Sequence, residues 1–164
     1  MNDHVYSRRP LDTHDNPPTN FYTRNGNLVA APDYFKVGLP KDQPLDGELW
    51  CGRGQFQQLI SITRSSAKSD GWKFVVFAVF DAPKLKDPST GRPAAFEYRL
   101  DWLKANLAQA NTGAKTFAQA IGFKRIVSNA EAEKELDDTL KDGGEGLMFR
   151  APRSLYQWRR DKVR

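Results

Sequence analysis

The alternation of apolar and polar positions predicts a hairpin early in the chain. The dipeptide Asn25-Gly26 favours a tight turn, and apolar pairs stand on both sides of it, at residues 21–22 and 28–29. Residues 45–50 are predicted to form a turn that leads into a strand. Residues 73–80 are a near-continuous run of β-branched and aromatic side chains, which is typical of a strand buried on both faces.

Two helices carry clear signals. Pro93 suits a first helical position, and apolar residues then recur every three or four positions on one face: Phe96, Leu100, Leu103 and Leu107. Ser128 and Glu131 have the spacing of a capping box before residues 130–140, and Gly143 is a helix stop.

The remaining segments complete the predicted organisation. Residues 123–127 are predicted to form a strand between the two helices. Residues 1–20 contain three prolines among polar residues and show no periodicity, which predicts an extended, disordered leader. Residues 21–164 are then one α+β domain with a mostly antiparallel sheet, and no internal repeat is visible.

Length and composition agree with one domain of this kind. The chain has 164 residues, of which 39% are hydrophobic, enough for one core. Cys51 is the single cysteine, so an internal disulfide is excluded. Neither a secretory signal nor an apolar run of about 20 residues is present. We therefore expect a soluble, intracellular protein without a membrane partner.

Positive charge is concentrated at the end of the chain. The net charge is +5, and the last fifteen residues hold a group of basic side chains against the single acid Asp161: Arg150, Arg153, Arg159, Arg160, Lys162 and Arg164. Such a cluster either contacts phosphate, with an affinity that falls as salt rises, or forms a solvated tail. The neighbouring Glu145 favours phosphate contact.

Two acidic residues are candidates for nucleotide or metal binding. Glu48 follows Asp46-Gly47, a dipeptide that most often marks only a turn, but Gly52 and Gly54 flank Arg53 and would let backbone approach a ligand. Glu145 lies between glycines and precedes Arg150 by five residues, so a carboxylate for Mg²⁺ stands near a cation for phosphate.

Four short motifs follow one another in an order that resembles the adenylation domain of ATP-dependent DNA ligases. They are residues 21–27 (FYTRNGN), 45–50 (LDGELW), 77–81 (FAVFD) and 144–150 (GEGLMFR). The resemblance continues to Tyr156, where the family has its last adenylation-domain strands. It implies a nucleotidyltransferase fold that uses ATP and Mg²⁺, with nicked duplex DNA as partner.

The resemblance also implies roles for individual residues. Arg24 would lie against the ribose and phosphates of the nucleotide, and Glu48 would touch the AMP ribose. Phe80 would stack on adenine, although an aromatic residue in a buried strand is more often part of the core. Glu145 would help to hold the metal, with Arg150 at a phosphate, while Arg159, Arg160, Lys162 and Arg164 would contact DNA.

One departure concerns the nucleophile. The family places its lysine in a Lys-x-Asp-Gly turn before the first motif, but the first lysine of this sequence is Lys36, between motifs. We therefore identify no catalytic residue and predict that the chain by itself does not form an enzyme–AMP adduct. A Lys-x-Lys strand and an OB-fold domain, which follow in the family, are also missing.

These departures leave three readings of the sequence. The first is a DNA ligase adenylation domain truncated at both ends, for which a second polypeptide could supply the missing parts. The second is a non-catalytic remnant that binds nucleotide or DNA. The third is an RNA ligase or a capping-type nucleotidyltransferase, which shares the fold and the motif order.

Overall fold

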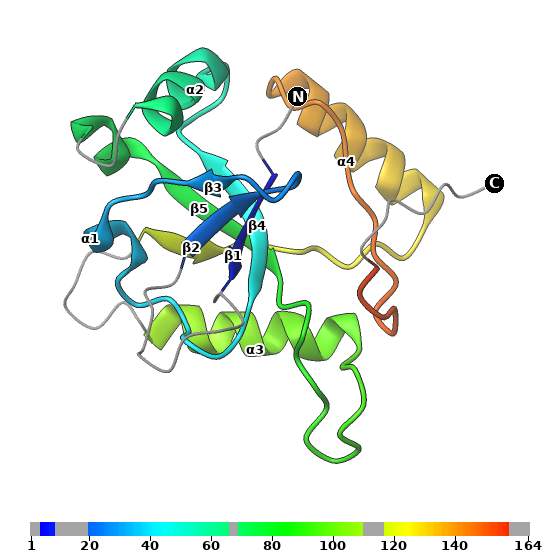
Figure 1. The fold of residues 1–164 in the computed structure, drawn as a ribbon. Coiled ribbons are helices and arrows are strands. Elements are labelled where there is room, and N and C mark those ends of the chain that lie inside the picture. The colour runs from blue at the N-terminus through cyan, green and yellow to red at the C-terminus, as the bar shows by residue number, and fades with distance from the viewer. Residues whose placement is uncertain (1–3, 9–19, 66–68, 110–116, 158–164) are drawn as a thin grey trace.

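The computed structural model describes residues 4–8, 20–65, 69–109 and 117–157, and it is built around one six-stranded sheet (Figure 1). The strand order is β3-β2-β1-β4-β5-β6. Its strands are β1 (His4–Arg8), β2 (Asn20–Thr23), β3 (Leu28–Val29), β4 (Leu45–Trp50), β5 (Val76–Asp81) and β6 (Ala118–Ala120). Neighbours pair antiparallel except β5 and β6, which are parallel. The predicted, mostly antiparallel sheet is confirmed.

The prediction of a disordered leader is wrong for residues 4–8. They form β1, which pairs antiparallel with β2 on one side and with β4 on the other. The strand was missed because its own sequence lacks a strong pattern, while two neighbouring strands supply its hydrogen bonds. Residues 1–3 and 9–19 lie outside the described residues.

The predicted hairpin of β2 and β3 is confirmed. Phe21 pairs with Val29 and Tyr22 with Leu28. Gly26 has φ +82, which explains the glycine at the turn, and its N–H donates to the carbonyl of Thr23 at 2.8 Å.

Strand β4 differs from its prediction because Asp46-Gly47 is not a turn. Both residues lie within the strand, where the register with β5 shifts between them. A Cβ atom on Gly47 would lie 2.5 Å from the carbonyl oxygen of Ala78 and 2.6 Å from the Phe77 ring. The glycine is therefore required for close approach of β5 rather than for a reversal of the chain.

Strand β5 is shorter than the predicted residues 73–80 and is buried mainly on one face. Residues Asp70–Phe74 instead form a 3₁₀ helix, η1. In β5, Phe77, Val79 and Asp81 are buried, whereas Val76, Ala78 and Phe80 are only partly buried. The face of the sheet that carries these partly buried side chains is therefore more open than the unbroken apolar run predicted.

Helices cover the buried face. Figure 1 shows α3 (Phe96–Gln109) along one edge of the fold and α1 (Asp33–Lys36) with α2 (Phe56–Arg64) at another. Their side chains meet the sheet in one core. In this core the ring centroids of Phe21 and Phe77 are 5.0 Å apart in an edge-on arrangement, and those of Phe35 and Trp72 are 4.9 Å apart. Helix α3 starts at Phe96, three residues after Pro93, and buries Leu103 and Leu107 as predicted.

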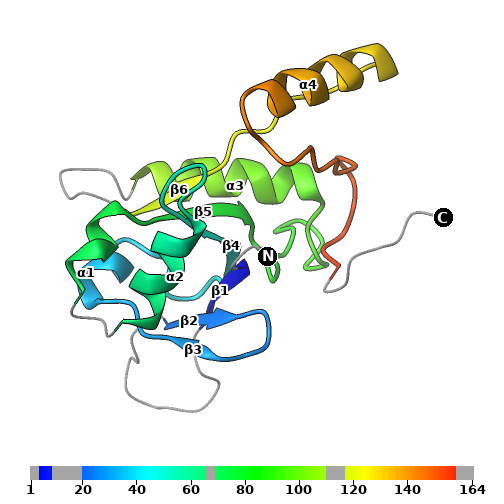
Figure 2. The ribbon, with the colours of Figure 1, turned by 90° about the horizontal axis from the view of Figure 1, so that it is seen from above.

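Helix α4 (Asn129–Lys141) stands apart from this core and buries no residue (Figure 2). Its capping box is confirmed: Ser128 accepts from the Glu131 N–H at 3.2 Å, and Glu131 accepts from the Val127 N–H at 3.0 Å. The strand predicted at residues 123–127 is wrong, because these residues have no ladder partner and β6 lies earlier in the chain.

The segment after α4, residues 142–157, is irregular in the structure, so the strands that the resemblance implied up to Tyr156 are not formed. This segment returns to the sheet and contacts it through side chains. In the part of the chain that is described, no helix is both long and apolar enough to cross a bilayer.

Candidate nucleotide-binding face

The pairing of β4 with β5 places two of the candidate residues on one face of the sheet. Glu48 pairs with Ala78, and directly paired residues share a face. Phe80 lies two residues beyond Ala78, so it shares that face too. Glu48, Ala78 and Phe80 are all partly exposed, while Gly47, Phe77 and Val79 point into the core. A carboxylate and an aromatic ring therefore stand together on the open face of the β4–β5 pair.

The hairpin brings Arg24 to the same level of the sheet. Thr23 pairs with Val5, and Val5 pairs with Gly47, so the turn that starts at Arg24 lies beside the row that contains Glu48. Two strand spacings of about 4.8 Å separate β2 from β4. Arg24 is exposed there, and its role at the ribose and phosphates stays a prediction.

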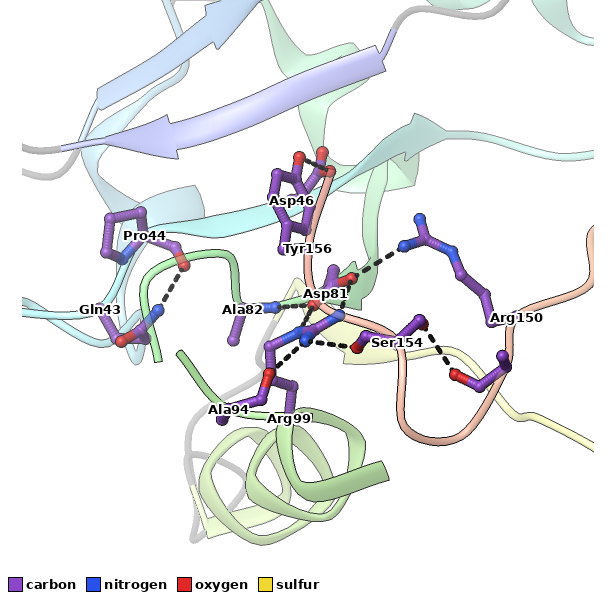
Figure 3. Close-up of polar contacts among 11 residues, drawn as sticks. Gln43, Pro44, Asp46, Asp81, Ala82, Ala94, Arg99, Arg150, Ser154 and Tyr156 are labelled. Carbon is purple, nitrogen blue, oxygen red and sulfur yellow. Dashed lines mark hydrogen bonds and ion pairs between the residues drawn. The ribbon is translucent and has the colours of Figure 1, made fainter. Parts of the chain in front are cut away.

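A buried ionic cluster lies at the far end of the β4–β5 pair (Figure 3). Asp81 is fully buried, and the Arg99 guanidinium binds both of its oxygens, Nε to Oδ1 at 2.6 Å and Nη2 to Oδ2 at 3.2 Å. Arg99 also donates to the carbonyl oxygens of Ala94 and Ser154. Since a buried charge is costly unless it is paired and hydrogen-bonded, these contacts explain how the pair is accommodated.

Arg150 joins this cluster. Its Nη1 lies 3.2 Å from Oδ2 of Asp81, and its guanidinium lies over the Phe96 ring at 5.6 Å. Arg150, the candidate residue for phosphate binding, thus uses one guanidinium nitrogen to contact the carboxylate of Asp81. An arginine carries five N–H donors, so further donors of Arg150 can meet a phosphate without loss of this contact.

A second buried carboxylate, Asp46, lies beside Asp81. Tyr156 donates to Oδ2 of Asp46 at 2.6 Å, which ties the end of the irregular segment to β4. Burial raises the pKa of Asp46 to about 7; the Tyr156 hydrogen bond opposes this rise, and the charge of Asp81 adds to it. Asp46 therefore titrates near neutral pH.

The other end of the irregular segment lies beside the loop between β4 and α2. A Cβ atom on Gly144 would lie 2.9 Å from Nη1 of Arg53. Residues 144–150 are thus anchored near both ends of the β4–β5 pair, by Gly144 beside Arg53 and by Arg150 at Asp81. Glu145 is exposed next to the first of these anchors.

Comparison with known proteins gives the same assignment as the motifs. The chain is 31% identical over 138 residues to a DNA ligase of Haemophilus influenzae, a match that covers 84% of this chain and 47% of that protein. The similarity extends over most of this chain and points to the DNA ligases, as the motifs do. It spans about half the length of this curated relative, and no family model matches it.

Solved structures of DNA ligases share the fold. A structure from work on DNA binding with a minimal scaffold in Lig E DNA ligases has a TM-score of 0.71 and 27% identity, and covers 96% of this chain and 59% of that one. Chlorella virus DNA ligase-adenylate has a TM-score of 0.65, 16% identity and coverage of 96% and 58%. The predicted α+β fold of a ligase adenylation domain is confirmed.

Sequence motifs indicated no role for several residues that lie at the β4–β5 pair. Asp81 and Arg99 were overlooked, although Arg99 falls three residues after Phe96 and four before Leu103, on the apolar face of α3. A charged residue at such a position signals a buried partner. Asp46 was read as a turn residue, and its bond to Tyr156 had no local signal because 110 positions separate them.

Some candidate residues remain outside this description. The basic residues Arg159, Arg160, Lys162 and Arg164 lie beyond the described residues. Among the residues that the structure describes, no group of three or more histidines, cysteines or acids could hold a metal ion.

Proposed function

We propose that the chain binds an adenine nucleotide on the β4–β5 face and that the whole protein is an ATP-dependent DNA ligase that seals nicks in duplex DNA. The observation that carries the proposal is the shared face of Glu48 and Phe80 on neighbouring strands, since Glu48 pairs with Ala78 and Phe80 follows Ala78 by two residues. Adenine stacks on the Phe80 ring, since every base offers a π-surface, and the carboxylate of Glu48 accepts hydrogen bonds from the ribose hydroxyls.

The remaining candidate residues act on the phosphates. Arg24 and Arg150 donate to phosphate oxygens from the hairpin side and from the Asp81 side of the face, through charge-assisted hydrogen bonds. Glu145 is exposed between glycines and fits a site at which Mg²⁺ is shared between one carboxylate and the nucleotide. When bound, the ion offsets the negative charge of the phosphates.

Adenylate transfer needs an amine held in line with the leaving pyrophosphate, and this sequence has no lysine before Lys36. Lys36 lies in α1, where it pairs with Asp33 at 3.2 Å. We propose that the chain alone binds ATP without covalent transfer of AMP, and that transfer depends on a lysine from elsewhere. The basic end, Arg159 to Arg164, contributes DNA contacts.

Two other functions share part of this proposal. A non-catalytic nucleotide-binding protein would use the same face, and an RNA ligase would differ in the acceptor strand. The 31% sequence identity to a DNA ligase over 84% of the chain favours DNA as the acceptor strand.

Equilibrium binding of ATP to the purified chain tests the proposed face. Phe80→Ala should weaken binding about fivefold or more, because loss of base stacking costs about 1–3 kcal/mol. Phe74→Ala is the matched control, since Phe74 is an exposed aromatic residue at the end of η1. Equal affinities of the Phe80 variant and the control would contradict the proposal.

A further inference from the structure

The loop between β4 and α2 holds an arginine in a compact turn. The N–H of Gln55 donates to the carbonyl of Gly52 at 3.3 Å, and the Cys51 thiol donates to the Gln55 carbonyl at 3.4 Å. Gly52 has φ +122 and Gly54 has φ +71, conformations that other residues rarely adopt. Arg53 therefore stands exposed at the tip of a loop whose backbone is defined on both sides of it.

A second glycine loop meets this one from a distant part of the chain. Gly144 follows the end of α4, where the N–H groups of Gly143 and Gly144 cap the carbonyls of Leu140 and Thr139. A Cβ atom on Gly144 would lie 2.5 Å from Cγ2 and 2.9 Å from the carbonyl oxygen of Thr139, and 2.9 Å from Nη1 of Arg53, so the two loops approach closely at this glycine. Glu145 is the next residue along the chain and is exposed.

Arg53 differs from the other arginines of this region in its contacts. Arg99 and Arg150 both contact Asp81. No hydrogen bond or salt bridge joins the Arg53 side chain to another residue in the part of the chain that the structure describes. The fork of N–H donors on Arg53 is therefore available to an anion, although Glu145 lies next to its neighbour Gly144.

The strand order relates this pair to the nucleotide face. Arg53 comes three residues after Trp50, and Trp50 pairs with Val76, two residues along β5 from the Glu48 and Ala78 pair. Phe80 lies in the opposite direction along β5. A nucleotide with its base on Phe80 and its ribose at Glu48 that extends its terminal phosphates toward the Trp50 end would bring them to Arg53 and Glu145.

We propose that Arg53 binds the terminal phosphates of the nucleotide, with Glu145 beside it for the phosphate-bound divalent cation. The inference rests on the proposed function and adds a residue to its binding site. A guanidinium matches phosphate oxygens with paired donors, and a single carboxylate completes the oxygen ligands of Mg²⁺. Two charges of opposite sign on adjoining loops suit a ligand that presents phosphate and metal together.

Binding of ATP with Mg²⁺ and binding of adenosine, each followed by NMR titration, separate phosphate contact from base contact. Arg53→Ala should weaken ATP binding about tenfold or more, as expected for loss of charge-assisted hydrogen bonds, and should leave adenosine binding unchanged. Arg92→Ala is the control, because Arg92 is an exposed arginine on the loop before α3 and its removal changes the net charge equally. It should affect neither ligand.

The outcomes distinguish the inference from the function on which it rests. If Arg53→Ala binds ATP like the wild-type chain while Phe80→Ala is weakened, the inference is wrong and the nucleotide face stands. If Arg53→Ala loses adenosine as well as ATP, Arg53 is not a phosphate ligand and the inference is also wrong. If the wild-type chain binds neither ligand, both the function and the inference are contradicted.

Discussion

The hydroxyl of Tyr156 donates a hydrogen bond of 2.6 Å to Oδ2 of Asp46, across 110 positions of sequence. Asp46 lies two residues before Glu48 on β4, and its neighbour Asp81 lies one residue after Phe80 on β5. The irregular segment at the end of the described chain is therefore fastened next to both residues that we assign to the nucleotide. Buried carboxylates thus hold the segment in place beside the partly exposed Glu48 and Phe80.

Replacement of Asp46 should change how stability depends on pH. Its pKa rises from 3.8 in the unfolded chain to about 7 in the fold, so between these values the folded state binds more protons and stability falls as pH rises. Asp46→Asn removes this pH-dependent loss of stability and keeps a side-chain oxygen that can accept the Tyr156 hydrogen bond. In urea unfolding, the free energy of unfolding of the variant minus that of the wild type should be larger at pH 8 than at pH 4.

The control for this prediction is Asp137→Asn, which changes an exposed carboxylate on α4. Its stability difference from the wild type should be nearly the same at both pH values. An equally constant difference for Asp46→Asn would show that Asp46 does not titrate in this range and would contradict the burial argument.

Gly47→Ala should destabilise the fold strongly. The new methyl group would lie 2.5 Å from a backbone oxygen of β5, and backbone in the centre of a sheet has little freedom to move. Overpacking of this kind costs about 1–3 kcal/mol or more. Gly122→Ala is the matched control, because no atom lies within 4 Å of its Cβ position. Thermal unfolding should show a lower midpoint for the first variant only.

Local signals predicted part of this fold, and the reasons are visible in particular elements. The β2–β3 hairpin and the cap of α4 were predictable because each depends on residues at most a few positions apart, such as Ser128 and Glu131. Strand β1 was not predictable from local signals, since its hydrogen bonds come from strands that are distant in the sequence. Residues 123–127 have a strand-like composition but no partner strand, so pattern alone misled.

The candidate site was predicted less completely than the fold. Motif order singled out Glu48 and Phe80, and the pairing of Glu48 with Ala78 together with the alternation along β5 places them on one face. The motifs did not reveal that Arg150 contacts Asp81, because this contact joins residues 69 positions apart. Arg53 was noticed only for its flanking glycines. Its proximity to Gly144 depends on how α4 ends, which local patterns do not determine.

Incubation with radiolabelled ATP and Mg²⁺ should give no protein band that survives denaturation. The reason is that no lysine precedes the first motif in this sequence. A labelled band that disappears in Lys36→Ala or Lys41→Ala would show that one of these lysines reaches the α-phosphate, and the proposed dependence on a lysine from elsewhere would be wrong.

The basic end should contribute a salt-sensitive component of DNA binding. Alanine at Arg159, Arg160, Lys162 and Arg164 together should lower the affinity for duplex DNA and reduce the slope of log affinity against log salt, because fewer counterions are released. Fluorescence anisotropy at several salt concentrations measures both quantities. Unchanged affinity and slope would identify the basic end as a solvated tail.

A crystal structure of the chain with ATP and Mg²⁺ tests the nucleotide-binding face most directly. The account predicts adenine stacked on Phe80 and ribose hydroxyls within hydrogen-bond distance of Glu48, on the open side of β4 and β5. A nucleotide bound on another surface, or bound here with its base away from Phe80 and its ribose away from Glu48, would contradict the account.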